Sequence, residues 1–101
     1  MESPTLVDVW TVEPSRRDEL RARILAMLGD VVSAQPGFVS ARVYESNDQG
    51  AVMVSIEMRT IKERQDLTDS AQIQTALREL RGIAHSQVRL YRLVGSFGEG
   101  S

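Results

Sequence analysis

Residues 35–46 read Gln-Pro-Gly-Phe-Val-Ser-Ala-Arg-Val-Tyr-Glu-Ser, and this stretch decides the fold. Pro36 cannot continue a helix and Gly37 lets the backbone turn, so the helical pattern before them must end here. A run of β-favouring residues starts at once with Phe38. This corner therefore joins a helix to a strand, and the rest of the chain can be assigned outward from it.

The chain before the corner predicts one strand and one long helix. Residues 5–12 are rich in β-branched and aromatic side chains, and Pro14 ends that strand. Ser15 with Asp18 resembles a capping box, so we expect a helix over about 15–34. Its buried stripe is predicted from apolar residues at helical spacing, which are Leu20, Ile24, Met27, Leu28 and Val31.

The chain after the corner predicts a hairpin. A second strand runs to about Ser46, the cluster Asn-Asp-Gln-Gly at 47–50 has the length and composition of a hairpin turn, and a third strand occupies 51–58. The second and third strands should therefore pair in antiparallel fashion.

Two further helices and a last strand complete the pattern. Thr60 and Glu63 form a second possible capping box, which predicts a short helix through Leu67. A longer helix is expected from Ser70 to Gly82, and a fourth strand from Val88 to about Phe97. The order βαββαβ predicts a ferredoxin-like α+β sandwich, in which helices cover one face of a four-stranded antiparallel sheet.

Composition places the chain among small single-domain proteins. It has 101 residues with a formal net charge of −2 and no basic stripe, so nucleic-acid binding is not expected. It has no cysteine and one histidine, which excludes a disulfide, a cysteine-based metal site and a multi-histidine site within one chain. No stretch resembles a signal peptide or a membrane span, and we expect a cytoplasmic protein with an ordered core over about 5–96 and a flexible tail at 97–101.

Alternation along the strands predicts two different faces of the sheet. The face expected under the helices is apolar, with Val7, Val9, Val39, Ala41, Val43, Val52, Val54, Ile56, Met58, Val88, Leu90 and Val94. The opposite face is mixed, with Asp8, Trp10, Val12, Phe38, Ser40, Arg42, Tyr44, Met53, Ser55, Glu57, Arg89, Tyr91 and Leu93.

The mixed face predicts a homodimer. It would expose four of the five aromatic side chains, together with acids and arginines that could pair with one another. Aromatic residues and arginine are enriched in the centres of interfaces. We expect the interface to contain Trp10, Phe38, Arg42, Tyr44, Glu57, Arg89 and Tyr91.

Several stretches resemble the antibiotic biosynthesis monooxygenase superfamily. They are the helix followed by residues 35–40, then 44–46, then 52–54 through 59–60, and finally 88–91. The resemblance implies a dimeric α+β barrel with a pocket between the sheet and the helices of each subunit. It also implies oxidation of an aromatic substrate by O2 without metal or flavin.

The chain departs from that family at particular positions. The third strand has Val54 and Met58 where quinone-forming members carry an Asn and a Trp, and the first strand has Val9 where haem-degrading relatives place an Asn. The short-helix region also carries no histidine, so haem degradation is disfavoured.

The chemistry expected from the resemblance is cofactor-independent monooxygenation of a phenol or hydroquinone. His85 could move protons, while Arg92 or Arg59 could hold an anionic substrate, so these three are the candidate catalytic residues. The candidate substrate pocket contains Thr11, Val54 and Met58. The alternative is a non-catalytic homodimer that binds a small apolar ligand or another protein.

Overall fold

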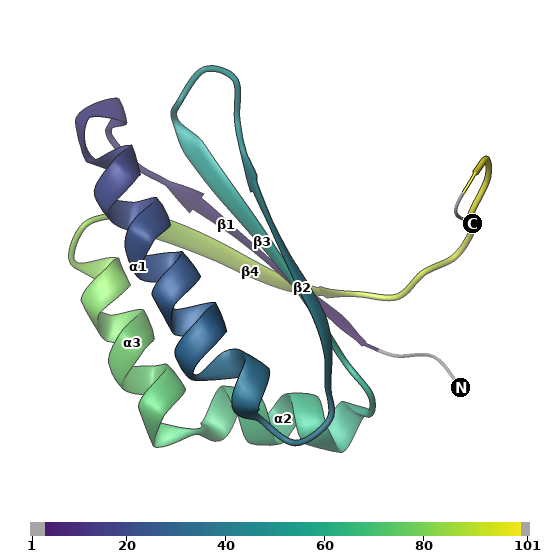
Figure 1. The fold of residues 1–101 in the computed structure, drawn as a ribbon. Coiled ribbons are helices and arrows are strands. Elements are labelled where there is room, and N and C mark those ends of the chain that lie inside the picture. The colour runs from purple at the N-terminus through teal and green to yellow at the C-terminus, as the bar shows by residue number, and fades with distance from the viewer. Residues whose placement is uncertain (1–3, 100–101) are drawn as a thin grey trace.

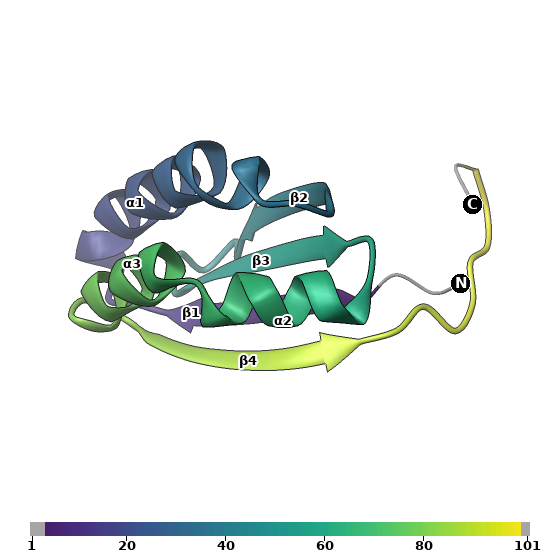
Figure 2. The same cartoon turned by 90° about the horizontal axis from the view of Figure 1, so that it is seen from below.

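The computed structural model describes residues 4–99 as one four-stranded antiparallel sheet with all its helices on one face (Figures 1 and 2). The strand order is β2-β3-β1-β4, so β1 lies inside the sheet and β4 forms an edge. The elements are β1 (Thr5–Thr11), η1 (Pro14–Arg16), α1 (Arg17–Asp30), η2 (Val32–Ala34), β2 (Phe38–Glu45), β3 (Ala51–Met58), α2 (Ile61–Asp69), α3 (Ala71–Arg81) and β4 (His85–Tyr91). The predicted ferredoxin-like α+β fold is confirmed.

The ends of the helices differ in how well the sequence predicted them. The Thr60 hydroxyl accepts a hydrogen bond from the Glu63 amide at 3.1 Å and Ser70 caps α3, as expected. The predicted box at Ser15 is wrong, because η1 precedes α1 and no side chain caps the first turn of α1. The predicted helix over 15–34 is therefore a regular α1 with a short 3₁₀ turn at each side.

The corner after α1 behaves as predicted and also introduces a bulge. Gly37 has φ of +83°, which favours glycine, and its carbonyl accepts a hydrogen bond from the Arg59 amide at 2.7 Å. The register of β2 against β3 then shifts between Phe38 and Ser40. This bulge turns Phe38 toward the core and leaves Val39 47% exposed, so the predicted orientations of both were wrong.

The last strand is displaced from its predicted position. β4 pairs with β1 over His85–Tyr91 and ends there, whereas the prediction extended it to residue 97. Residues 92–99 leave the sheet and run away from the body of the protein, with Val94 exposed (Figure 1). The last part of the predicted flexible tail, residues 100–101, lies outside the described residues.

The faces of β1 are the reverse of the prediction. Trp10 is 1% exposed and pairs with the buried Val52, and Asp8 pairs with the buried Val54, so both lie on the helix-covered face. Val7 and Val9 lie on the open face. The physical reason is that the side chains of Leu6, Trp10 and Val12 point to the same side of the strand. Burying that side removes more apolar surface from water than burying Val7 and Val9 would.

The core lies between the sheet and the helices. It is built from buried side chains of the inner sheet face, α1, η2, α2 and α3, namely Trp10, Val12, Leu20, Ile24, Met27, Leu28, Val32, Val52, Val54, Ile56, Met58, Leu67, Ile73, Leu80 and Ala84. Arg17 and Arg21 of α1 both reach Glu45 at the end of β2, at 3.0 and 2.9 Å, which ties the helix to that edge of the sheet. Within residues 4–99, no helix has the length and apolar character required to cross a membrane.

Candidate functional site

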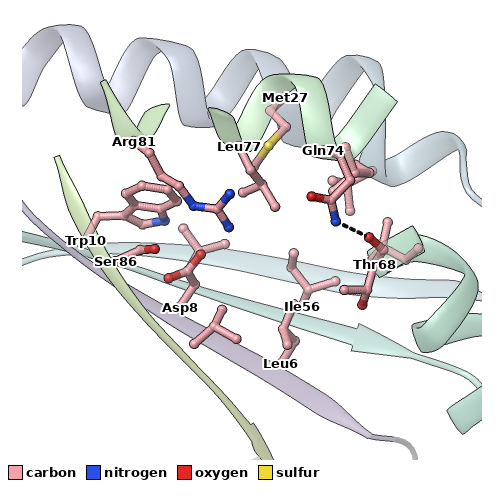
Figure 3. Close-up of a pocket in the computed structure, with 15 residues that line it drawn as sticks. Leu6, Asp8, Trp10, Met27, Ile56, Thr68, Gln74, Leu77, Arg81 and Ser86 are labelled. Carbon is pink, nitrogen blue, oxygen red and sulfur yellow. Dashed lines mark hydrogen bonds between the residues drawn. The ribbon is translucent and has the colours of Figure 1, made fainter. Parts of the chain in front are cut away.

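A cavity of about 130 Å³ lies between the inner face of the sheet and the helices (Figure 3). Most of its wall is apolar and comes from β1, β3, β4 and all three α-helices. Six lining residues carry groups that can form hydrogen bonds, and these are Asp8, Trp10, Thr68, Gln74, Arg81 and Ser86. A mostly apolar cavity with a few polar groups is the usual form of a small-molecule site.

Asp8 is the most unusual of these residues. Its row across the inner sheet face consists otherwise of Val43, Val54 and Val88. The side chain is 8% exposed, and its buried Oδ1 has no hydrogen-bond partner. Burial raises the pKa of Asp8 from 3.8 to about 6, while the charge of Arg81 and the indole N–H of Trp10 oppose that rise. The carboxylate is therefore available to accept a proton near neutral pH.

Arg81 supplies a positive charge at the same end of the cavity. It is the last residue of α3, and its guanidinium extends over the cavity toward Asp8, next to the Trp10 ring (Figure 3). Its side chain is exposed, so the charge lies at the opening and not in the interior. Val88, which lines the cavity, is also 55% exposed, so the opening lies between the end of α3 and the edge strand β4.

Gln74 and Thr68 define the other end of the cavity (Figure 3). The Gln74 Nε2 group donates a hydrogen bond to the Thr68 carbonyl at 2.5 Å, which links α3 to the last turn of α2. Because a backbone carbonyl can only accept, the amide must present its NH2 to Thr68. The Gln74 Oε1 atom then faces the cavity as an acceptor (Figure 3).

The structure separates the predicted catalytic residues from this cavity. His85 is exposed and lines a different depression, which also includes Thr11 and Arg81. Arg59 and Arg92 are exposed just beyond the ends of β3 and β4. None of the three lines the cavity.

The other predicted site residues divide in the same way. Of the proposed pocket residues, Val54 lines the cavity, whereas Met58 is fully buried in the core and Thr11 is exposed outside it. Trp10 and Phe38 were wrongly assigned to the dimer interface, because both pack against the core. The register places the remaining predicted interface residues on the open face, and these are Arg42, Tyr44, Glu57, Arg89 and Tyr91.

The sequence analysis did not identify Asp8, Arg81 or Gln74 as residues of the cavity. Asp8 was placed on the open face, where Arg42 and Arg89 were expected to pair with it. Asp8 alternates with Leu6 and Trp10 along the strand, and this spacing could have predicted that it shares their buried face. No group of three or more His, Cys, Asp or Glu side chains suited to a metal ion occurs within residues 4–99.

Comparisons with known proteins identify the family of this chain. The family model described as antibiotic biosynthesis monooxygenase matches residues 5–58, which is more than half of the chain. The chain belongs to the antibiotic biosynthesis monooxygenase family. The predicted assignment to a family of monooxygenase enzymes is thereby confirmed, and so is the resemblance on which it rested.

Individual relatives of this antibiotic biosynthesis monooxygenase family member extend over nearly the whole chain. Tetracenomycin-F1 monooxygenase of Streptomyces glaucescens is 27% identical over 97 residues, which are 96% of this chain and 87% of the relative. SnoaB, a cofactor-independent oxygenase from Streptomyces nogalater, has a similar structure with a TM-score of 0.78 at 19% identity, covering 98% of this chain and 100% of SnoaB. A conserved protein from Methanosarcina mazei also has a similar structure, with a TM-score of 0.80 at 14% identity. The match covers 91% of this chain and 93% of that protein.

Replacing Asp8 by Asn should stabilise the protein at high pH. The folded state binds the Asp8 proton more tightly than the unfolded state, so wild-type stability falls as pH rises from about 4 to about 6 and stays low above that. The shift from 3.8 to about 6 corresponds to at most about 3 kcal/mol. Urea denaturation should show Asp8→Asn to be more stable than wild type at pH 8, with the difference shrinking at pH 4.

Asp30→Asn is the matched control, because Asp30 is exposed near the end of α1. It should show no such dependence. An Asp8→Asn variant that is less stable than wild type at pH 8 would contradict the described environment of Asp8.

Proposed function

We propose that the chain is a cofactor-independent monooxygenase that oxidises a small phenol with O2. The proposal depends mainly on one observation, which is a buried Asp8 carboxylate, with one oxygen that has no hydrogen-bond partner, inside an apolar cavity of a monooxygenase-family protein. Keeping a charge there without full hydrogen bonding costs folding free energy, and such costs are typical of functional sites.

In the proposed reaction, the phenol enters with its hydroxyl at the Asp8 end of the cavity. Asp8 accepts the hydroxyl proton, and the phenolate oxygen is stabilised by the Arg81 guanidinium beside it. The apolar walls exclude water and hold the ring, so the electron-rich phenolate faces dissolved O2 in a fixed orientation. The protein thus supplies a base, a cation and a dry site, while the substrate supplies the electrons.

The electrons and atoms then balance without any other reductant. The phenolate transfers one electron to O2, and the resulting radical and superoxide combine to form a C–O bond at the ring carbon opposite the hydroxyl. The peroxide takes up one proton from solvent, and loss of the ring C–H proton with cleavage of the O–O bond releases water, while Asp8 gives its proton back to solvent at the opening of the cavity. The products are a quinone that contains one oxygen atom of O2 and one molecule of water.

A suitable test substrate is 1-naphthol, in which the ring carbon opposite the hydroxyl carries only hydrogen. Wild-type protein should consume O2 and form 1,4-naphthoquinone with one ¹⁸O atom from ¹⁸O2, and kcat/KM should rise with pH through about 6 as Asp8 ionises. Asp8→Asn should lower kcat/KM by about 100-fold or more, and Arg81→Met by about tenfold. Oxygen consumption and mass spectrometry of the product measure these effects.

The controls distinguish a reaction in the cavity from one at the residues that the sequence analysis proposed as catalytic. Asp30→Asn and Arg78→Met change exposed side chains of the same types and should leave the rate unchanged. Uptake no faster than the buffer blank would remove the oxygenase function. Loss of activity in His85→Ala or Arg92→Ala, with Asp8→Asn unaffected, would move the chemistry away from the cavity.

We also infer that two copies associate through the open face of the sheet. That face carries apolar and aromatic side chains that no helix covers, among them Val7, Val9, Met53, Tyr44 and Tyr91. Arg42, Glu57 and Arg89 lie among them and could form ion pairs across a two-fold axis. An uncovered apolar face of this kind favours an interface.

Sedimentation at micromolar concentration should therefore give a species of twice the 11.2 kDa chain mass. Tyr91→Glu should shift the protein toward the monomer, because it places a charge on the open face. Leu25→Glu is a matched control, since both side chains are 51% exposed and Leu25 lies on α1 away from that face. A wild-type species of 11.2 kDa would contradict the dimer.

A further inference from the structure

The cavity carries hydrogen-bonding groups at two ends, and only one end is used in the proposed reaction (Figure 3). Asp8, Arg81 and Ser86 lie at the reaction end, and Gln74 lies at the other, beyond the apolar side chains of Leu77 and Ile56. A ligand that spans the cavity therefore meets a second polar group that the chemistry does not require.

The second group is a hydrogen-bond acceptor of fixed orientation. Its NH2 is held by the Thr68 carbonyl at 2.5 Å, and the Thr68 hydroxyl is itself occupied in a hydrogen bond to the Arg64 carbonyl at 2.9 Å. Within residues 4–99, no side chain or amide donates to Gln74 Oε1. A flipped amide would place Gln74 Oε1 against the Thr68 carbonyl oxygen, and both atoms are acceptors. The side chain therefore directs its oxygen, and not its NH2, into the cavity.

The size of the cavity limits what can reach both ends. An apolar cavity of about 150 Å³ in another protein is known to take up one benzene molecule. The present cavity, at about 130 Å³, therefore encloses one aromatic ring, and a second ring can extend only toward the opening beside Val88. A substrate of one or two rings fits this space, whereas a ligand of four fused rings exceeds it.

We propose that Gln74 is a specificity-determining residue that selects mono- or bicyclic phenols carrying a second hydroxyl at the end remote from the reacting one. This inference rests on the proposed function and names the substrate class of the same site. The reacting hydroxyl lies at Asp8, and the remote hydroxyl donates to Gln74 Oε1. A ligand without a donor there leaves a partly buried acceptor unsatisfied and binds less tightly.

The test compares 1,5-dihydroxynaphthalene with 1-naphthol, two ligands of the same ring size that differ by the remote hydroxyl. Isothermal titration calorimetry under argon measures Kd without turnover, and kcat/KM is measured in air for both. Wild type should bind the diol about tenfold more tightly. Gln74→Leu should bring the Kd ratio close to one.

A second variant and a control keep the result interpretable. Gln74→Lys retains a donor for the Thr68 carbonyl but has no acceptor, so it should also lose the preference even if Gln74→Leu folds poorly. Gln72→Leu alters an exposed glutamine of the same helix and should keep the wild-type ratio. A purely structural role for Gln74 would change stability while leaving the ratio intact.

The outcomes distinguish this inference from the proposed function. Tighter binding of the diol that is lost only in the Gln74 variants supports the inference even if no O2 is consumed. Oxidation of both compounds with the same preference in wild type and Gln74→Leu overturns the inference and leaves the oxygenase function standing. Equal affinity of wild type for the two ligands, or no binding of either, also overturns it.

Discussion

The central constraint in this protein is the two-residue period of β1. This strand lies inside the sheet, between β3 and β4, and its helix-covered face carries the buried Trp10 and the partly buried Leu6, with the buried Val12 directly after the strand. The same parity places Asp8 in a row of valines beneath the helices. The strand cannot rotate the acid outward without exposing the tryptophan, so the fold holds a buried carboxylate, one oxygen of which has no hydrogen-bond partner.

The surroundings of Asp8 moderate its charge without neutralising it. An ion pair with Arg81 would hold the carboxylate deprotonated at low pKa, and it would then be a weak base. Instead Arg81 lies at the opening of the cavity and only opposes the effect of burial, so the pKa of Asp8 is raised to about 6. That value suits a group that must take up and return a proton near neutral pH. The buried acid lowers stability, and the proposed chemistry gives a reason for keeping it.

The sequence predicted the order of elements because their signals are local. Pro36 and Gly37 form the corner before β2, the Thr60–Glu63 box begins α2, and the alternation of apolar and polar residues identifies β3. The faces of β1 were not predictable from alternation alone, since valines lie on one parity and Leu6, Trp10 and Val12 on the other. The bulge at Phe38 also reversed two side chains, and it depends on pairing with β3 rather than on local sequence.

The candidate site was harder to predict because its parts are distant in the sequence. Asp8, Gln74 and Arg81 line one cavity only when α3 packs over the sheet, and an arginine at the end of a helix has no distinctive pattern of its own. His85, Arg59 and Arg92 were chosen for their residue types, yet all three are exposed and lie outside the cavity. The resemblance to the family did imply a pocket between sheet and helices, which is where the cavity lies.

The most direct test of the central claim is a carbon-detected NMR titration of the Asp8 side-chain carboxyl, assigned by the loss of its signal in Asp8→Asn. The buried carboxylate should titrate with a midpoint of about 6, well above the ordinary 3.8. A midpoint near or below 3.8 would mean that Asp8 is solvated or forms an ion pair. It would contradict the role of Asp8 as the group that accepts the substrate proton.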